Sequence, residues 1–507
     1  MTSTLRQGVH SLLLTAFAGF MGHAPRAYKV GLLAALVGNV LLWALAGNTV
    51  VGWAFVIEFI VTLAMALKCY PLAPGGLLAI EAVLLGLTTP ERVYAETGHG
   101  LPILLLLLFM VSAIAFMQEL LVFIFARVLV ALRSRVLLGL AFCSAAALLS
   151  AFLDALTVIA VVMTVALGFY RIYFIAAAGG EVADEHLGHD VHLPEERAGE
   201  LRQFRQALRA LLMHAAVGTA LGGVCTLVGE PQNLLIGHVM DWSFMQFAQQ
   251  VAPVSLPVLA VGLLTCVGLE QFRLFGFGAD VPPSVRQMLA EHEQREAQQR
   301  TTRDRWRLLV QGAAAVLLVI ALALHWAEVG LIGLAIVVCL TALLGVAEEH
   351  RLAEAMKTAI PFTALLVVFF AIVAVIHDQA LFQPIVDWVL SQRGAGQTAW
   401  LYLANGALSA ISDNVFVATV YITEIKKAFD GGLISADQYA RLAVAVNTGT
   451  NIPSVATPNG QAAFLFLLTS ALAPLLRLSY GRMVWMALPY FITMTGAGLL
   501  AVIYLLH

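Results

Sequence analysis

The stretch "LLSAFLDALTVIAVVMTVAL" (148–167) places one aspartate, Asp154, in an otherwise uncharged and mostly apolar run. A carboxylate at membrane depth is costly and marks a functional site by default. The uncharged run extends from Val136 to Tyr170 on either side of Asp154, which is too long for one membrane span. We therefore predict a re-entrant helical hairpin with its turn near Asp154. Asp154 and Thr157 should face a polar pocket, because free backbone groups at this depth are tolerated only when protein or water surrounds them.

The composition indicates a membrane protein. Of 507 residues, 60% are hydrophobic and 12% are charged, and the mean hydropathy is +0.88. A soluble domain carries about 25% charged residues. We predict an all-α polytopic fold with on the order of a dozen spanning segments. The net charge of −3 excludes a broad basic surface for nucleic acid.

Two polar stretches, 179–206 and 270–307, interrupt the apolar pattern. The second carries seven arginines, so the positive-inside rule places it in the cytoplasm, where it would link two halves. The first contains His186, His189 and His192, whose spacing suits a metal but is better explained by a solvated loop. The predicted divisions are scaffold helices (1–135), a first transport repeat (136–269), the linker (270–307), second-half scaffold helices (308–394), and a second transport repeat with the C-terminal helix (395–507).

The sequence contains an internal repeat. "ALLSAFLDALTVIAVV" (147–162) and "GALSAISDNVFVATVY" (406–421) share six of sixteen positions, including Asp154 and Asp413. Downstream, 217–236 and 447–466 each contain Gly-Thr, a helix-breaking stretch, then proline and asparagine. Several arginines precede the first motif and one precedes the second, which indicates opposite orientations. Inverted repeats with a site at the midplane are a recurring plan of secondary transporters.

We predict broken helices near 218–233 and 447–459, which would expose backbone carbonyls and amides. Together with Asn and Thr oxygens and a carboxylate, they make a site for a hard cation near Asp154 and Asp413. A proton and a cation that compete for one carboxylate can be exchanged if the site opens alternately to each side. The alternative for the glycines is close helix packing. The further candidate ligands are Thr226, Glu230, Asn233, Asn414, Asn447, Thr450, Asn451, Thr457 and Asn459.

Other charged residues in or beside apolar runs have less support. Glu58, Glu81, Glu119 or Asp378 could act as a second proton carrier, or could simply lie at wet span ends. Lys68 lies near a span end, where its long side chain can reach water. The sequence has no Walker A, HExxH or GxSxG motif, so neither ATP-driven transport nor hydrolysis is expected.

At these motifs the chain resembles the NhaB family of bacterial sodium/proton antiporters, within the ion transporter superfamily. The similarity covers "VTLAMALKCYPLAPGGLLAIEA" (61–82), "SAFLDALTV", "VGEPQNL", "AISDNVFVATVYI" and the region from "NTGTNIPSVATPNG" onward. It implies a multi-pass inner-membrane protein that exchanges Na⁺ and Li⁺ for H⁺ by alternating access, without a cofactor. It also implies two inverted repeats, each with a re-entrant hairpin and a broken helix, in a homodimer. The family's "FLDALT" aspartate, implicated in sodium handling, corresponds to Asp154.

The alternative function is a Na⁺-coupled symporter for an anion or carboxylate. Such transporters of the superfamily carry neutral Ser-Asn-Thr tips, whereas the tips here read "LDALT" and "SDNVF". Two fixed negative charges would repel an anionic substrate. The tips also lack a basic residue to anchor an anion, so the sequence favours cation exchange.

Overall fold

The computed structural model is all-helical over the residues that it describes, 15–178, 195–357, 359–392 and 394–506. The three histidines of the polar loop, at 186, 189 and 192, lie outside these residues. The chain forms two compact units, one from Met1–Gly100 with Pro361–Pro384 and one from Leu101–Ile360 with Ile385–His507. The prediction of an all-α fold is confirmed, and each unit is described separately below.

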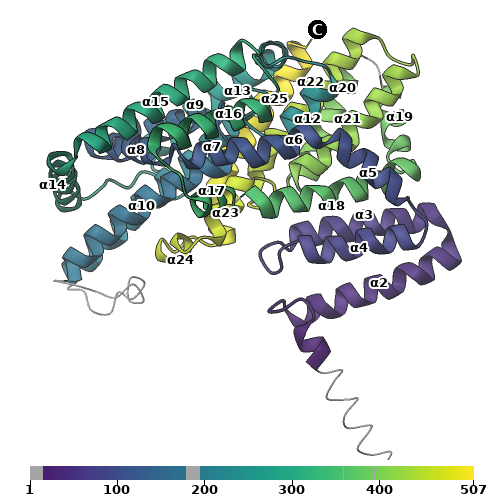
Figure 1. Cartoon of the computed structure of the whole chain (residues 1–507), viewed down its shortest axis with the longest axis horizontal. Coiled ribbons are helices and arrows are strands. Elements are labelled where there is room, and N and C mark those ends of the chain that lie inside the picture. Colours follow the sequence, from purple (N-terminus) through teal and green to yellow (C-terminus); the bar gives the residue numbers. More distant parts are fainter. Residues whose placement is uncertain (1–14, 179–194, 358, 393, 507) are drawn as a thin grey trace, which may run out of the picture. The chain divides into compact units, whose positions relative to one another are not determined.

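The first unit consists of α2 (Arg26–Ala46), α3 (Asn48–Ala64), α4 (Leu72–Leu84), α5 (Pro90–His99) and most of α18 (Ala359–Asp378). In Figure 1, α2, α3 and α4 are the purple helices that lie side by side. Gly47 joins α2 to α3 with φ +82°, a backbone conformation that glycine adopts without strain. Phe59 of α3 meets Phe369 of α18 edge to face, with ring centroids 5.4 Å apart, so aromatic packing joins the two segments of this unit.

The second unit contains both sequence motifs of the predicted repeat. The elements before the first motif are α6 (Leu101–Leu105), the π-helical turn η1 (Leu106–Met110), α7 (Val111–Ala115) and α8 (Gln118–Ala131). The first motif lies on α9 (Arg135–Ser150), α10 (Ala155–Ala178), α11 (Glu195–Gly223), α12 (Pro231–Val239) and α13 (Phe244–Phe272). The connecting elements are α14 (Pro283–Gln299), α15 (Thr302–Ala323), α16 (Val329–Leu344), α17 (Glu349–Met356) and α19 (Gln383–Ser391).

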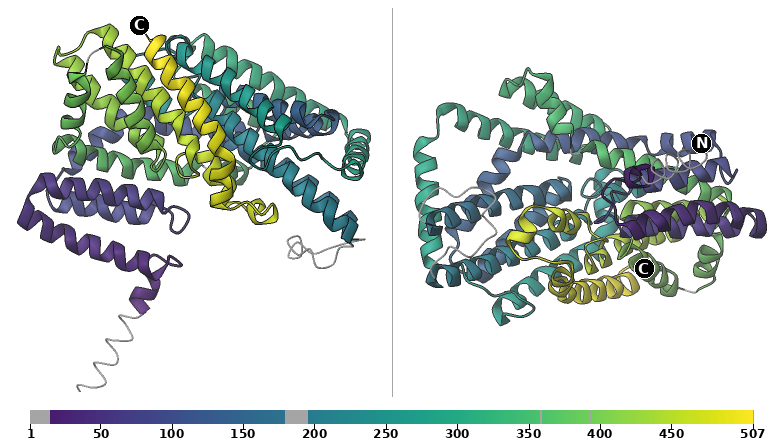
Figure 2. Two further views of the ribbon diagram at one scale, coloured as in Figure 1. Left: turned by 180° about the vertical axis from the view of Figure 1, so that it is seen from behind. Right: turned by 90° about the horizontal axis from the view of Figure 1, so that it is seen from below.

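The second motif lies on a matching series of helices. These are α20 (Ala395–Ser409), α21 (Asn414–Asp430), α22 (Ala436–Asn451), the 3₁₀ turn η4 (Pro453–Ala456), α23 (Ala462–Thr469), α24 (Leu472–Leu475) and α25 (Tyr480–Tyr504). Figure 2 shows α25, in yellow, running beside the teal α13, and the two helices are in extensive contact. The last helix of each motif therefore packs against its counterpart.

Glycines let α9 and α11 approach closely. A Cβ atom added at Gly218 or Gly222 of α11 would collide with the backbone carbonyl groups of Cys143 and Ala147 in α9. Close packing, the alternative to ion contact, is therefore the role of these two glycines. It also explains why the Gly-Thr positions are helical, whereas the sequence placed them in the break.

Six of the described helices are long and apolar enough to cross a membrane, and α5 would make a seventh candidate if it forms one span with the helix that follows it. Four shorter apolar helices, α3, α4, α9 and α16, do not reach this length. The number is smaller than the predicted dozen because several apolar segments are divided into shorter helices. The chain is nevertheless a multi-pass membrane protein, as expected.

Candidate ion-binding site

Two aspartates occupy equivalent helix starts in the second unit. The Oδ2 atom of Asp154 accepts hydrogen bonds from the backbone N–H groups of Leu156 and Thr157, at 3.0 and 3.3 Å. In the same way, the Oδ1 atom of Asp413 accepts hydrogen bonds from the backbone N–H groups of Val415 and Phe416, at 2.8 and 3.3 Å. Each carboxylate therefore satisfies two N–H groups that a helix start leaves free, one of them from Thr157 after the first tip. The second oxygen of each aspartate has no hydrogen bond within the described part of the chain, so it is available for a cation.

A threonine ties each tip to the break in its own half. The Thr226 hydroxyl donates a hydrogen bond to the backbone carbonyl of Ala151, and the Thr457 hydroxyl donates to that of Ala410. Ala151 and Ala410 are identical positions in the aligned tips, and both threonines lie in the predicted breaks. The contact is therefore repeated between the two halves.

Two glycines repeat in the same way. A Cβ atom at Gly229 would lie 2.8 Å from the carbonyl oxygen of Ser150, and one at Gly460 would lie 2.5 Å from that of Ser409. Only glycine allows so close a backbone approach. The broken segment of each half therefore packs closely against the last helical turn before the aspartate of the same half.

The two halves are joined by amide side chains. Gln232 Nε2 donates to Asn451 Oδ1 at 2.7 Å, and Asn451 Nδ2 donates to Asn233 Oδ1 at 2.9 Å. Asn233 Nδ2 in turn donates to the backbone carbonyls of Gly223 and Thr226, each at 2.7 Å. These hydrogen bonds fix the start of α12 to the end of α22, so the two breaks lie side by side.

Glu230 brings a third carboxylate to the tips. It precedes α12, is 4% exposed, and its Oε1 atom is buried without a hydrogen-bond partner among the described residues. Its charge interacts with those of both Asp154 and Asp413. No basic side chain in the described ranges forms an ion pair with any of the three. Since like charges in a buried site repel one another, the three acids need bound cations or protons.

Further polar atoms at the tips are buried and unpaired in the described structure. They are the hydroxyls of Ser150 and Ser409 and the Oδ1 atom of Asn414. Buried polar atoms without partners are uncommon, so these oxygens are candidate ligands of a bound ion. The sequence predicted Asn414 as a ligand. Ser150 and Ser409, like Gln232 beside Asn233, were not predicted, although the two serines are identical positions of the repeat.

Three further predicted ligands, Asn447, Thr450 and Asn459, belong to the second half. Asn447 and Thr450 are inside α22, which continues to Asn451 because Gly449 packs against the α20 backbone. Thr450 donates to the backbone of its own helix at 2.7 Å and to the α20 residue Asn405 at 3.3 Å. Asn447 Oδ1 accepts from Asn451, while Asn459 is half-buried between η4 and α23. Asn447 and Thr450 therefore support the site through hydrogen bonds in the helices rather than from a free loop.

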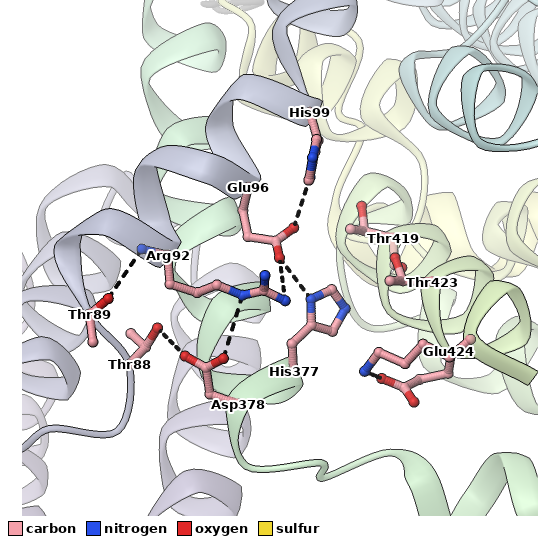
Figure 3. Close-up of polar contacts among 11 residues, drawn as sticks. Thr88, Thr89, Arg92, Glu96, His99, His377, Asp378, Thr419, Thr423 and Glu424 are labelled. Carbon is pink, nitrogen blue, oxygen red and sulfur yellow. Dashed lines mark hydrogen bonds and ion pairs between the residues drawn. The ribbon is translucent and has the colours of Figure 1, made fainter. Parts of the chain in front are cut away.

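The first unit contains a separate cluster of paired charges (Figure 3). Glu96 lies 3.2 Å from an Arg92 nitrogen and 3.0 Å from His377 Nδ1. Asp378 lies 3.4 Å from Arg92 and accepts a 2.7 Å hydrogen bond from the Thr88 hydroxyl. Asp378, one of the predicted second proton carriers, is thus compensated by an arginine.

Two other alternative residues lie at the surface. Glu119 forms an ion pair with Arg307 at 3.2 Å in the second unit, and its side chain is 55% exposed. Lys68 is exposed in the connection between α3 and α4 of the first unit. An exposed, paired carboxylate does not need a proton to offset burial. Glu58 and Glu81 remain as candidates.

Comparison with known proteins identifies the family of this chain. The family model described as Bacterial Na+/H+ antiporter B (NhaB) matches residues 11–507. A Na(+)/H(+) antiporter NhaB of Pseudomonas putida is 60% identical over 487 residues, which cover 96% of this chain and 97% of the relative. Those of Pseudomonas paraeruginosa (60% over 494 residues; 97% and 99%) and Pseudomonas fluorescens (59% over 491 residues; 96% and 98%) are equally similar. The chain therefore belongs to the NhaB family of bacterial Na⁺/H⁺ antiporters.

Proposed function

We propose that this Na⁺/H⁺ antiporter exchanges its ions at a site formed by Asp154, Asp413 and Glu230, by alternating access across the bacterial inner membrane. As a member of this family the chain is a transporter rather than an enzyme, and no cofactor is expected. The observation that carries the proposal is the meeting of three carboxylates without a basic partner in the described structure; Asp154 and Glu230 are buried and Asp413 is half-buried. Such a set is stable only when cations or protons neutralise it.

The oxygen atoms at the tips suit an alkali cation. One carboxylate oxygen of each aspartate is left over after capping, and the Asn414 amide and the two tip serines add neutral oxygens. Hard cations prefer such oxygen ligands. Lithium is also a hard cation, so we expect it to replace sodium.

Proton binding completes the exchange. When Na⁺ leaves, the carboxylates again repel one another, and protons from the opposite side neutralise them. Because proton and cation compete for the same oxygens, each lowers the apparent affinity for the other. No other energy source is needed for exchange down the combined gradient.

Two inverted repeats in a homodimer are the architecture that we propose. The repeated Thr-to-carbonyl and glycine contacts at the two tips support the repeat. Opposite tips that meet at one site would let rigid movement of the site expose it to either side in turn. The helix breaks at Asp154 and Asp413 support re-entrant hairpins.

An assay in everted membrane vesicles tests the function. Addition of NaCl or LiCl should dissipate a respiration-generated pH gradient without any organic anion, and Asp413→Asn should reduce this response severely. Glu291→Gln, at an exposed position of α14, is the matched control and should respond normally. A response that requires an added anion would favour symport and contradict the proposal.

A further inference from the structure

Asn39 holds two glutamates together inside the first unit. Its Nδ2 atom donates hydrogen bonds to Glu58 Oε2 at 2.8 Å and to Glu81 Oε2 at 3.1 Å. The asparagine is fully buried, and its Oδ1 atom has no hydrogen-bond partner among the described residues. A single amide group thus brings carboxylates from α3 and α4 to one point beside α2.

This point lies deep along apolar helices. Gly47 marks the end of the α2–α3 pair; Asn39 lies eight residues before it and Glu58 lies eleven residues after it. At a helical rise of ~1.5 Å per residue, Asn39 is about 12 Å and Glu58 about 17 Å from this end. In a hydrocarbon core about 30 Å thick that begins at Gly47, these distances correspond to a position near the middle. Acids at this depth are functional candidates rather than wet span ends.

Several basic groups of the same unit have other partners or are exposed. Lys29 of α2 donates to backbone carbonyls near the start of the described chain at 2.8 and 2.9 Å, and Lys68 is exposed. His377 of α18 contacts Glu96, as Figure 3 shows. Within the described residues, neither Glu58 nor Glu81 has an ion pair. The cluster in Figure 3 is therefore charge-compensated, whereas the pair on Asn39 is not.

We propose that Glu58 and Glu81 hold one exchangeable proton between them, as a proton-binding site separate from the ion site in the second unit. Two carboxylates that share one amide donor cannot both stay ionised at low cost, because their charges repel and no cation offsets them. A proton on either oxygen removes this cost without any rearrangement. A metal cation would have to displace the amide N–H groups that occupy the space between the carboxylates, so the geometry favours H⁺ over Na⁺.

Infrared spectroscopy of the reconstituted protein tests the proposal. At alkaline pH, where ordinary glutamates are ionised, the wild type should show the carbonyl band of a protonated carboxyl group. The double variant Glu58→Gln, Glu81→Gln should lose band intensity equal to one carboxyl group per chain. Glu91→Gln, at an exposed position of α5, should lose none. An unchanged band in the double variant would show that both acids are ionised and would overturn the proposal.

Labelling of the wild-type protein gives a second readout that needs no folded variant. A hydrophobic carbodiimide, which modifies protonated carboxyl groups in membranes, should label Glu58 or Glu81 at alkaline pH and spare Glu91, as mass spectrometry can show. Protection by NaCl but not by choline chloride would indicate a sodium site and refute the proton assignment. Both readouts should be unchanged in an Asp154→Asn background. Failure of this proposal can therefore be told apart from failure of the proposed exchange site.

Discussion

Replacing Asp154 by asparagine removes the charge of the first tip but keeps its cap. The carboxylate oxygen that accepts two N–H groups at 3.0 and 3.3 Å can be matched by the amide oxygen of asparagine. Asparagine and aspartate are about equally good at a helix start, so the stability should change by less than ~1 kcal/mol. Asp154→Ala removes charge and cap together and should cost about 1 kcal/mol more.

The effect on sodium should be much larger than the effect on stability. Two unit charges 4 Å apart interact with about 4 kcal/mol at an effective dielectric constant of ~20. Loss of this attraction corresponds to roughly 1,000-fold weaker sodium binding, since ~1.4 kcal/mol is tenfold. The charge of Asp154 also helps the remaining two acids to hold protons, which compete with sodium. Its loss weakens this competition, so 1,000-fold is an upper value and about 100-fold would still fit.

The assay compares apparent sodium affinity with thermal stability. Exchange is followed in everted vesicles over a range of NaCl concentrations, and unfolding is followed on the same variants purified in detergent. Asp154→Asn and Asp154→Ala should lose sodium-dependent exchange alike, although only the alanine variant is clearly destabilised. If Asp154→Asn keeps the wild-type apparent affinity, Asp154 is a structural cap and the proposed site is wrong.

Two further predictions concern the contacts that hold the tips. Thr226→Val or Thr457→Val leaves a tip carbonyl without its hydrogen-bond donor, so we expect a loss of about 1–3 kcal/mol in unfolding free energy and weaker apparent sodium affinity. Serine at either position keeps the hydroxyl and should retain both properties. A valine variant with normal stability and affinity would show that these hydrogen bonds do not hold the tips. Gly222→Ala places a methyl group against the backbone of Ala147 and should lower the free energy of unfolding in detergent by about 3 kcal/mol. Gly312→Ala is the control, because no atom lies within 4 Å of the added methyl group, and it should leave this free energy nearly unchanged. Equal effects of the two variants would contradict the close approach of α9 and α11.

Part of the site could be predicted because its signals are local. A charged residue in a long apolar run is visible without any coordinates, and so are the proline and glycine residues that end α11 and α22. The repeat identified Asp413 as the partner of Asp154, and the structure places both at helix starts. The break was predicted too early in each half because glycine is ambiguous. It can end a helix or allow two helices to touch, and only the neighbouring helix decides which.

The sequence by itself determined the all-helical membrane fold, the family and the acids at depth, because hydropathy, charge and helix-breaking residues act along the chain. Only the tertiary structure decided which distant groups meet. Gln232 and Asn451 are more than 200 residues apart in the sequence, yet a hydrogen bond joins them. Among the acids in apolar segments, Glu58 and Glu81 are the two that accept hydrogen bonds from Asn39. Such contacts depend on how the helices pack. The periodicity of a segment shows which of its faces is buried, but it does not show which residue of another helix that face will meet.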